Sequence, residues 1–185
     1  MKRLEILLIA LFLLVTVDIS QAQVAKNETK KVIKSENKGG HIALRKLKGV
    51  SINPVSKVNF VKSFGKQPET IWKRGIFFDE ATFREGGHDI TAYFDEKGIL
   101  VGTTSLVNFG DIPMLAQKMI FKTYKYARIG KVIFFDDNEL NATDMVMYGI
   151  QFDDADNYFV EMTQGTKRFI LDCNKKGKVV IFKNL

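Results

Sequence analysis

The sequence Ile76-Phe77-Phe78-Asp79 returns unchanged as Ile133-Phe134-Phe135-Asp136 later in the chain. A second pair of similar sequences follows, Asp95-Glu96-Lys97-Gly98 after the first copy and Asn174-Lys175-Lys176-Gly177 after the second. Glycine in such a position is typical of a short hairpin loop, because it readily adopts a positive φ. From the aspartate that ends the tetrapeptide to the first residue of the loop sequence there are 16 residues in the first copy and 38 in the second. The difference matches one added hairpin. We therefore expect an internal duplication with an enlarged second unit.

Each copy contains one expected helix. The first begins at Asn53-Pro54, a capping residue followed by proline, and ends near Gly65. The second has Asp111 as a plausible cap and Pro113 in its first turn. Apolar residues recur at steps of three and four in both, which is typical of amphipathic helices. These residues are Val55, Val58 and Val61, with Phe60 and Phe64 on the adjoining stripe, and then Ile112, Leu115, Ala116, Met119, Thr123 and Tyr126.

Runs rich in β-branched and aromatic residues follow each helix and are separated by turn signals. The expected strands cover 71–78, 89–94 and 99–106 in the first unit, and 129–135, 145–152, 158–163, 167–173 and 178–182 in the second. Strands that follow one another without intervening helices favour an antiparallel sheet over a parallel βαβ arrangement. The expected fold class is therefore α+β, with repeat one at about 52–108 and repeat two at about 109–185.

The first 22 residues have the features of an export signal. Lys2 and Arg3 precede an apolar run over 6–17, and Ser20-Gln21-Ala22 provides small residues before a cleavage site at Gln23. A retained anchor is the alternative, but the run is shorter than the roughly 20 residues that cross a bilayer. We expect a signal peptide at 1–22, a basic flexible lead-in at 23–50 and one domain at 51–185, located in the periplasm or outside the cell.

The net charge of +7 comes from the lead-in. Residues 23–48 contain eight basic and two acidic side chains, whereas residues 49–185 contain 18 basic and 17 acidic. This tail is either a solvated linker or a weak contact for an anionic membrane surface or an acidic partner. Because the remaining chain has almost no basic excess, we expect no nucleic-acid partner. The basic tail includes Lys30, Lys31, Lys34, Arg45, Lys46 and Lys48.

No catalytic or metal-binding motif is recognisable. His41 and His88 are isolated from one another in the sequence. The acidic run at 153–156 lacks the glycine and glutamate that a calcium loop of the EF-hand type requires, so we interpret it as a hairpin turn. Cys173 is the single cysteine, and strand alternation places it beside Phe169 and Leu171 as a small buried residue. We predict no catalytic residues, no metal and no cofactor.

Aromatic residues on the expected strands are the feature with functional potential. Adjacent phenylalanines on a strand point to opposite faces, so one of each pair should face away from the helices. If that face is open, it is an apolar binding surface; if loops or the N-terminal segment cover it, it is a second core layer. The candidate binding face consists of Trp72, Phe77, Tyr93 and Phe134.

The order of these elements resembles the PepSY-like proteins of exported bacterial origin. The resemblance rests on Trp72 after a helix, Ala92-Tyr93-Phe94-Asp95-Glu96-Lys97-Gly98, Asp111-Ile112-Pro113, and Tyr158-Phe159-Val160-Glu161. It covers roughly 52–183 and implies the fold of β-lactamase inhibitory proteins, two helix-plus-antiparallel-sheet repeats forming one continuous concave sheet. No inhibitory motif can be matched residue by residue.

We expect a non-catalytic module that holds a protein or peptide on a sheet face, with inhibition as one form of that activity. The alternatives are an envelope-associated structural protein attached through the basic tail and, third, an enzyme using carboxylates at strand ends.

Overall fold

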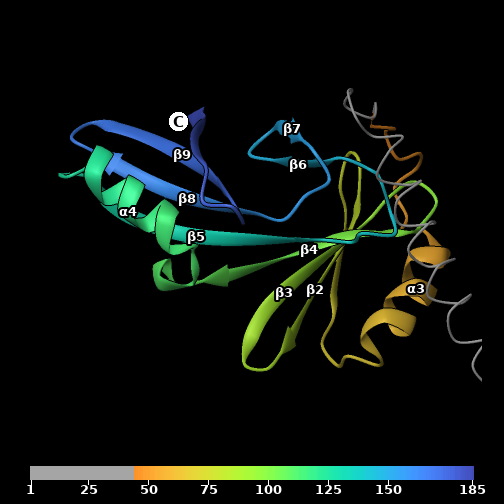
Figure 1. The fold of residues 1–185 in the computed structure, drawn as a ribbon. Helices are drawn as coiled ribbons and strands as arrows, with labels where there is room; N and C mark the ends of the chain where they lie inside the picture. The colour runs from red at the N-terminus through yellow and green to blue at the C-terminus, as the bar shows by residue number, and fades with distance from the viewer. Residues whose placement is uncertain (1–43) are drawn as a thin grey trace, which may run out of the picture. The chain divides into compact units, whose positions relative to one another are not determined.

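The computed structural model describes residues 44–185, which form an α+β fold (Figure 1). Among these residues, no helix combines the length and apolar character needed to cross a membrane. The helices are α3 (Pro54–Phe64), the short 3₁₀ helix η1 (Phe109–Asp111) and α4 (Met114–Thr123). The strands are β1 (Ile71–Arg74), β2 (Asp79–Glu85), β3 (His88–Phe94), β4 (Leu100–Val107), β5 (Arg128–Asp137), β6 (Met145–Met147), β7 (Ile150–Phe152), β8 (Asn157–Gln164), β9 (Lys167–Asn174) and β10 (Val179–Asn184).

Eight strands form one continuous antiparallel sheet in the order β1-β2-β3-β4-β5-β8-β9-β10. Each half is a meander of four strands preceded by a helix, and β4 joins the halves by pairing with β5. The duplication and the fold class expected from the sequence are therefore confirmed. The remaining strands, β6 and β7, pair only with each other and form the extra hairpin of the second repeat.

Three apolar clusters show which element covers which face. Both helices pack on the same side of the sheet, α3 around Phe60 and α4 around Ala116 and Ile120. The β6–β7 hairpin packs on the opposite side, where Met145 and Phe152 cover Phe135 and Phe159. This hairpin makes part of that face a second core layer, one of the two alternatives left open by the sequence.

Helix α3 begins as expected: the side chain of Asn53 accepts a hydrogen bond of 2.9 Å from the Val55 amide, and Pro54 occupies the first turn. The predicted buried stripe was partly wrong. Ser56 and Phe60 are buried, whereas Val55, Val58 and Val61 are exposed. Phe60 instead contacts Phe83, Trp72 and Phe64 at ring-centroid distances of 5.1, 5.4 and 5.3 Å.

Helix α4 starts at Met114, and Asp111 does not cap it. Asp111 belongs to η1, where its carboxylate accepts a hydrogen bond from the Asn108 amide at 2.8 Å. The buried side of this region is Ile112, Ala116 and Ile120, while Leu115, Met119 and Tyr126 are exposed. In both helices a small residue faces the sheet, because a hairpin turn packs closely against the first helical turn.

Two strand predictions were also wrong. The expected strand at 71–78 ends at Arg74, and the chain turns through Gly75–Phe78 into β2, which the sequence analysis did not predict. The expected strand at 145–152 is the β6–β7 hairpin, whose turn residues Tyr148 and Gly149 have φ of 52° and 77°. Positive φ at both positions is the geometry of a two-residue hairpin turn.

The two identical tetrapeptides are not structurally equivalent, whereas the two hairpin turns that begin at Asp95 and Asn174 are. Ile76–Asp79 spans a turn, and its copy lies within β5. By contrast, Asp95 accepts hydrogen bonds from the amides of Lys97 and Ile99, and Asn174 accepts them from those of Lys176 and Lys178. The β3–β4 and β9–β10 turns are therefore the same structure built twice.

Candidate binding surface

One wall of the candidate binding surface is formed by residues 44–50, a segment that we call the strap. The strap lies against the turn after β1: the Leu47 amide donates to the Ile76 carbonyl at 2.8 Å, and Arg74 Nη2 donates to the Lys48 carbonyl at 2.6 Å. Leu44 packs into the cluster beneath the β6–β7 hairpin. These contacts hold an extended piece of chain beside the face of the sheet that lacks helices.

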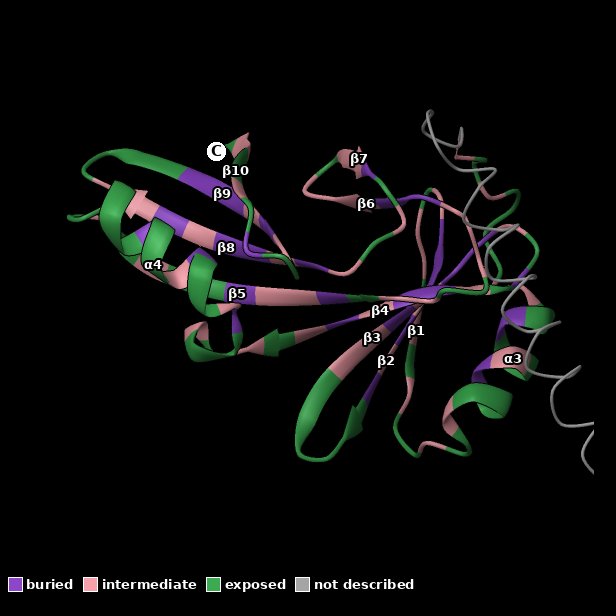
Figure 2. Cartoon of the chain, in the orientation of Figure 1, coloured by how far each residue is buried: buried purple, intermediate pink, exposed green. Residues whose placement is uncertain are grey.

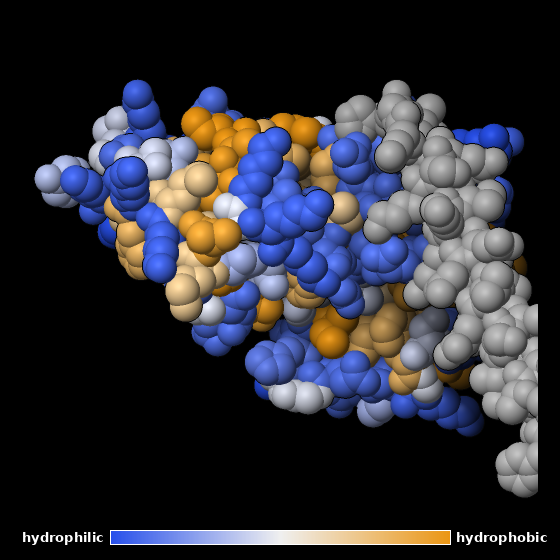
Figure 3. Space-filling model, viewed as in Figure 1, coloured by the Kyte–Doolittle hydropathy of each residue, from blue (hydrophilic) through white to orange (hydrophobic). Residues whose placement is uncertain are grey.

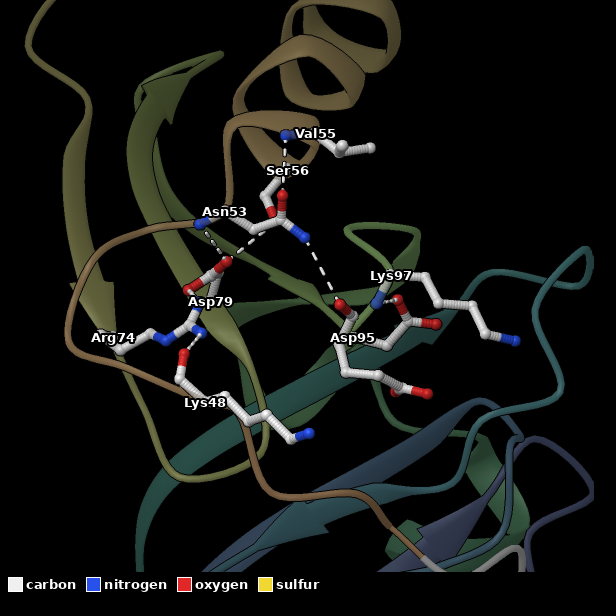
Figure 4. Close-up of polar contacts among 9 residues, drawn as sticks. Lys48, Asn53, Val55, Ser56, Arg74, Asp79, Asp95 and Lys97 are labelled. Atoms are coloured by element: carbon white, nitrogen blue, oxygen red, sulfur yellow. Dashed lines mark hydrogen bonds and ion pairs between the residues drawn. The ribbon is translucent and has the colours of Figure 1, made fainter.

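Asp79 holds the strap, the first helix and the sheet together (Figure 4). Its fully buried carboxylate accepts hydrogen bonds from the Asn53 amide and Ser56 Oγ, both at 2.9 Å, and pairs with Arg74 at 2.7 Å. A buried charge without its partner costs several kcal/mol of stability, so a buried ion pair favours one arrangement of the groups around it. Arg74 in turn donates to the Lys48 carbonyl of the strap, so one network fixes the strap against the first two strands.

Between the strap, the β1–β2 turn and the hairpin lies an open groove with a volume of about 890 Å³. Its lining is mostly apolar and comes from segments far apart in the sequence. The two cations in the lining are already paired, Lys73 with Glu80 and Arg74 with Asp79. The apolar and aromatic lining residues are Leu44, Val50, Ile76, Phe77, Phe78, Tyr93 and Val146.

The structure brings together two of the four residues of the predicted binding face. Phe77 and Tyr93 both line the groove, and Phe78 lies between them at ring-centroid distances of 6.4 and 6.1 Å. The Tyr93 hydroxyl shares a hydrogen bond of 3.0 Å with Thr104, and burial raises the pKa of Tyr93. The ring is therefore fixed as part of the groove wall.

Trp72 and Phe134 lie on the other face of the sheet. Trp72 packs against Phe60 of α3 and belongs to the first helix core. Phe134 stacks on Tyr158 at a ring-centroid distance of 4.7 Å, with the Lys175 ammonium 5.8 Å from its ring centre. The grouping of four residues was therefore incorrect for these two, because their strand positions point toward the helix side.

Sequence reasoning missed the strap and the hairpin as walls of the groove. Leu44 fell within the expected flexible lead-in, and Val146 within a strand expected in the main sheet. The apolar residues Ile42, Leu44 and Leu47 were the one signal for the strap, and they favour order at 42–47 within an otherwise flexible lead-in. Of the basic tail, Lys30, Lys31 and Lys34 lie outside the described residues, as does the expected signal peptide; Arg45 reaches Glu96 at 3.7 Å.

A cluster of carboxylates lies at the base of the hairpin, where β5 ends and β8 begins. Burial, followed by repulsion from Asp154, Glu139, Asp156 and Asp136, raises the pKa of Asp137 to about 7. Lys175 pairs with Asp156 at the edge of this cluster. Within residues 44–185, no set of three or more His, Cys, Asp or Glu side chains is arranged to hold a metal ion.

A second, smaller cavity of about 330 Å³ lies on the other side of the hairpin. It contains Asp153, Asp172 and Lys178. Burial raises the pKa of Asp172 to about 6, with Asp153 adding to the shift and Lys178 opposing it. Cys173, next in the chain, points to the helix side and is fully buried as predicted, and burial raises its pKa to about 12. The thiol is thus buried in the helix-side core, on the face of β9 opposite the cavity, where a nucleophilic role is not favoured.

Two helix-plus-meander repeats joined in one sheet define the class of fold, and solved structures of this class are similar. The chain matches a β-lactamase-inhibitory-protein-like (BLIP-like) protein of Bacteroides fragilis at a TM-score of 0.57 and 14% identity, over 74% of this chain and 89% of that one. It matches a DUF2874 family protein of Bacteroides uniformis at 0.58 and 12% identity, over 73% and 89%.

A third match is a protein of Bacteroides eggerthii named for an inferred periplasmic location, at a TM-score of 0.58 and 9% identity, over 73% of this chain and 88% of that one. At these identities the likeness concerns the fold. No family model and no curated protein matches the chain.

Proposed function

We propose that this protein is an exported, non-catalytic binding module of PepSY-like type that holds an extended protein or peptide segment in the groove between the strap and the hairpin. The observation that carries the proposal is the groove itself, an apolar and aromatic hollow that residues 44–185 leave unfilled. Apolar hollows with fixed walls are the usual sites of specific recognition. The export signal expected from the sequence and the periplasmic name of one structural neighbour support a periplasmic or extracellular location.

The side chain of Ile76 makes the groove suitable for a partner. It is 66% exposed at the tip of the β1–β2 turn, while its carbonyl is held by the Leu47 amide of the strap. A fixed backbone with an exposed apolar side chain loses little conformational entropy on binding. An extended apolar segment of a partner would therefore contact Ile76, Phe77 and Tyr93 together.

Affinity capture from the envelope of the source organism tests this proposal with two matched variants. Ile76→Glu places a charge in the groove, whereas Ile71→Glu places one outside it at a residue of almost equal exposure, 69%. We expect Ile76→Glu to reduce recovery of a stoichiometric partner about tenfold or more and Ile71→Glu to leave it unchanged. Equal recovery with both variants, or no partner at any salt concentration, would contradict the proposal.

The cavity with Asp153 and Asp172 is the basis for a second candidate function, acid–base catalysis by carboxylates. A carboxyl with a pKa of about 6 can exchange protons near neutral pH. If the protein is an enzyme, Asp172→Asn abolishes its turnover and leaves partner capture intact. The remaining alternative, envelope attachment through the basic tail, predicts that deletion of 23–43 releases the protein from the envelope while the described fold persists.

A further inference from the structure

The outward faces of both helices carry exposed apolar residues. On α3 these are Val55, Val58 and Val61, and on α4 they are Met114, Leu115, Met119 and Phe121. Figure 2 shows the exposed outer sides of the two helices, and Figure 3 shows hydrophobic and hydrophilic side chains interleaved over α4. Val58 is 53% exposed and Phe121 is 60% exposed, although large apolar side chains at such helical positions usually face a core.

Lysines occupy the same faces. Lys57 and Lys62 project from α3, and Lys118 and Lys122 from α4, all of them exposed. Neither helix contains a single aspartate or glutamate. Lys62 and Lys122 lie in the last helical turns, where a cation also stabilises the helix dipole, but this effect does not account for the exposed apolar residues.

Acidic residues are concentrated in one stretch of the chain. Residues 132–166, which include the hairpin and its flanking loops, contain eight acidic side chains and no lysine or arginine. The rest of 49–185 contains 18 basic and nine acidic side chains. The loops that flank the hairpin, on the face opposite the helices, carry Asp144, Asp153 and Asp154, although Lys73, Arg74 and Lys178 line the cavities on that face as well.

We propose that the outward faces of α3 and α4 bind the surface of an anionic lipid bilayer. The lysines would contact the head groups, and the apolar side chains between them would enter the boundary with the acyl chains. The acidic loops that flank the hairpin would then be repelled from the surface, and this orients the domain. Its groove faces away from the lipid and stays accessible to a partner.

A bilayer fits these faces better than an acidic protein does. The two cavities described above both lie at the hairpin side, and neither includes a residue of α3 or α4. Both helices carry the same mixture of exposed apolar residues and lysines. A lipid surface has the same chemistry at every point, so it can bind both helices in the same way. A specific protein partner would need matched pockets or directional acceptors.

Vesicle co-sedimentation tests the proposal with residues 23–185, which keep the whole described fold and omit the apolar segment that would itself enter lipid. The vesicles are pure phosphatidylcholine, or phosphatidylcholine with about 30% phosphatidylglycerol, at low and high salt. The test variant is Lys62→Gln/Lys118→Gln/Lys122→Gln. The matched control is Arg84→Gln/Lys131→Gln/Lys167→Gln, which removes three exposed charges from strands.

We expect binding to the anionic vesicles that salt weakens, because the attraction of exposed lysines is screened. The helix variant should lose about tenfold or more of its partition coefficient, and the strand variant no more than about threefold. Val58→Ser/Met114→Ser, which leaves the charge unchanged, should also weaken binding by about threefold. Circular dichroism checks that each variant is folded.

Three results would overturn the proposal. Equal binding to neutral and anionic vesicles would remove its electrostatic basis. Equal loss in the helix and strand variants, or no loss in either, would assign the binding to overall charge or to the basic tail. No binding to any vesicle, with capture of an acidic protein through the same lysines, would assign the helix faces to a protein partner.

Discussion

Gly98 and Gly177 are equivalent residues of the two repeats, and each lies where a hairpin turn meets the first turn of a helix. A Cβ atom added at Gly98 would lie 2.7 Å from the Ser56 backbone nitrogen, and one added at Gly177 would lie 2.7 Å from Leu115 Cβ. Both glycines have positive φ, 76° and 82°. The duplicated hairpin therefore positions both helices on the sheet through a contact that side chains would block.

Alanine at either position is expected to destabilise the fold. The left-handed backbone costs a non-glycine residue about 1–2 kcal/mol, and the close contact adds to that cost. Gly98→Ala should be the more severe, since backbone cannot move aside as a side chain can. Gly86→Ala is the control, because it has positive φ but open space around it. Urea unfolding measures all three, and equal losses for Gly98 and Gly86 would contradict the contact.

Substitution of Asp79 by alanine should cost about 3–5 kcal/mol of unfolding free energy, because it leaves Arg74 without its buried partner. The neighbouring pair Lys73–Glu80 is a natural control. The pair is 3.1 Å apart with Lys73 exposed and Glu80 half-buried but not enclosed, so Glu80→Gln should cost no more than about 1 kcal/mol. Chemical denaturation gives both values. If the two substitutions have similar effects, the Asp79 network does not hold the strap and helix as described.

The carboxylate cluster predicts that stability falls as pH rises. The pKa of Asp137 is raised to about 7 in the folded protein, above the ordinary value of about 3.9 for an unfolded chain. The folded state therefore binds the proton more tightly, and the cost of ionisation appears between pH 4 and 7 and is complete above 7. Asp137→Asn should raise Tm by a few degrees at pH 8 and not at pH 4.

Asp89→Asn, an exposed carboxylate on β3, is the control for that comparison. A gain for Asp137→Asn that is the same at both pH values would contradict the assignment.

Phe152 should be essential to the attachment of the β6–β7 hairpin. It is buried against Phe135, Phe159 and Phe182 at ring-centroid distances of 5.3, 5.0 and 6.0 Å. Phe152→Ala is expected to cost about 3–5 kcal/mol and to increase binding of an apolar dye as the covered face opens. Leu140→Ala, in the exposed loop before the hairpin, should do neither. If stability falls but the dye signal does not change, the hairpin has stayed in place and closed over the space left by the phenyl ring, which would contradict this prediction.

The parts of the fold that the sequence predicted are those decided by local chemistry. Asn53-Pro54 caps a helix, and Asp95 and Asn174 organise their turns through bonds to amides two and four residues ahead. These interactions need no distant partner, so they can be recognised from a few residues. The repeat followed from the similarity of these two turns, whereas the added hairpin was inferred from a spacing that starts at the tetrapeptides, which are not structurally equivalent.

The errors concern residues whose role depends on distant contacts. Asp79 resembles a turn residue in the sequence, but Arg74, Ser56 and the Asn53 amide bury it at the start of β2. Ser56 and Ala116 face the core because the glycine turns come too close for larger side chains, and this directs the valines of α3 outward. Of the predicted binding face, Phe77 and Tyr93 line the groove, and Phe77 reaches it from a turn and not from a strand.

The burial of Cys173 has a practical consequence. Its thiol is inaccessible and has its pKa raised to about 12, so maleimide reagents should leave it unmodified in the folded protein. A cysteine introduced at an exposed site, such as Ile76 in the groove or Val58 on the first helix, would then be the one reactive thiol among residues 23–185. Fluorophores placed singly at these two positions would report partner capture and lipid contact separately, on a chain that needs no prior removal of native cysteine.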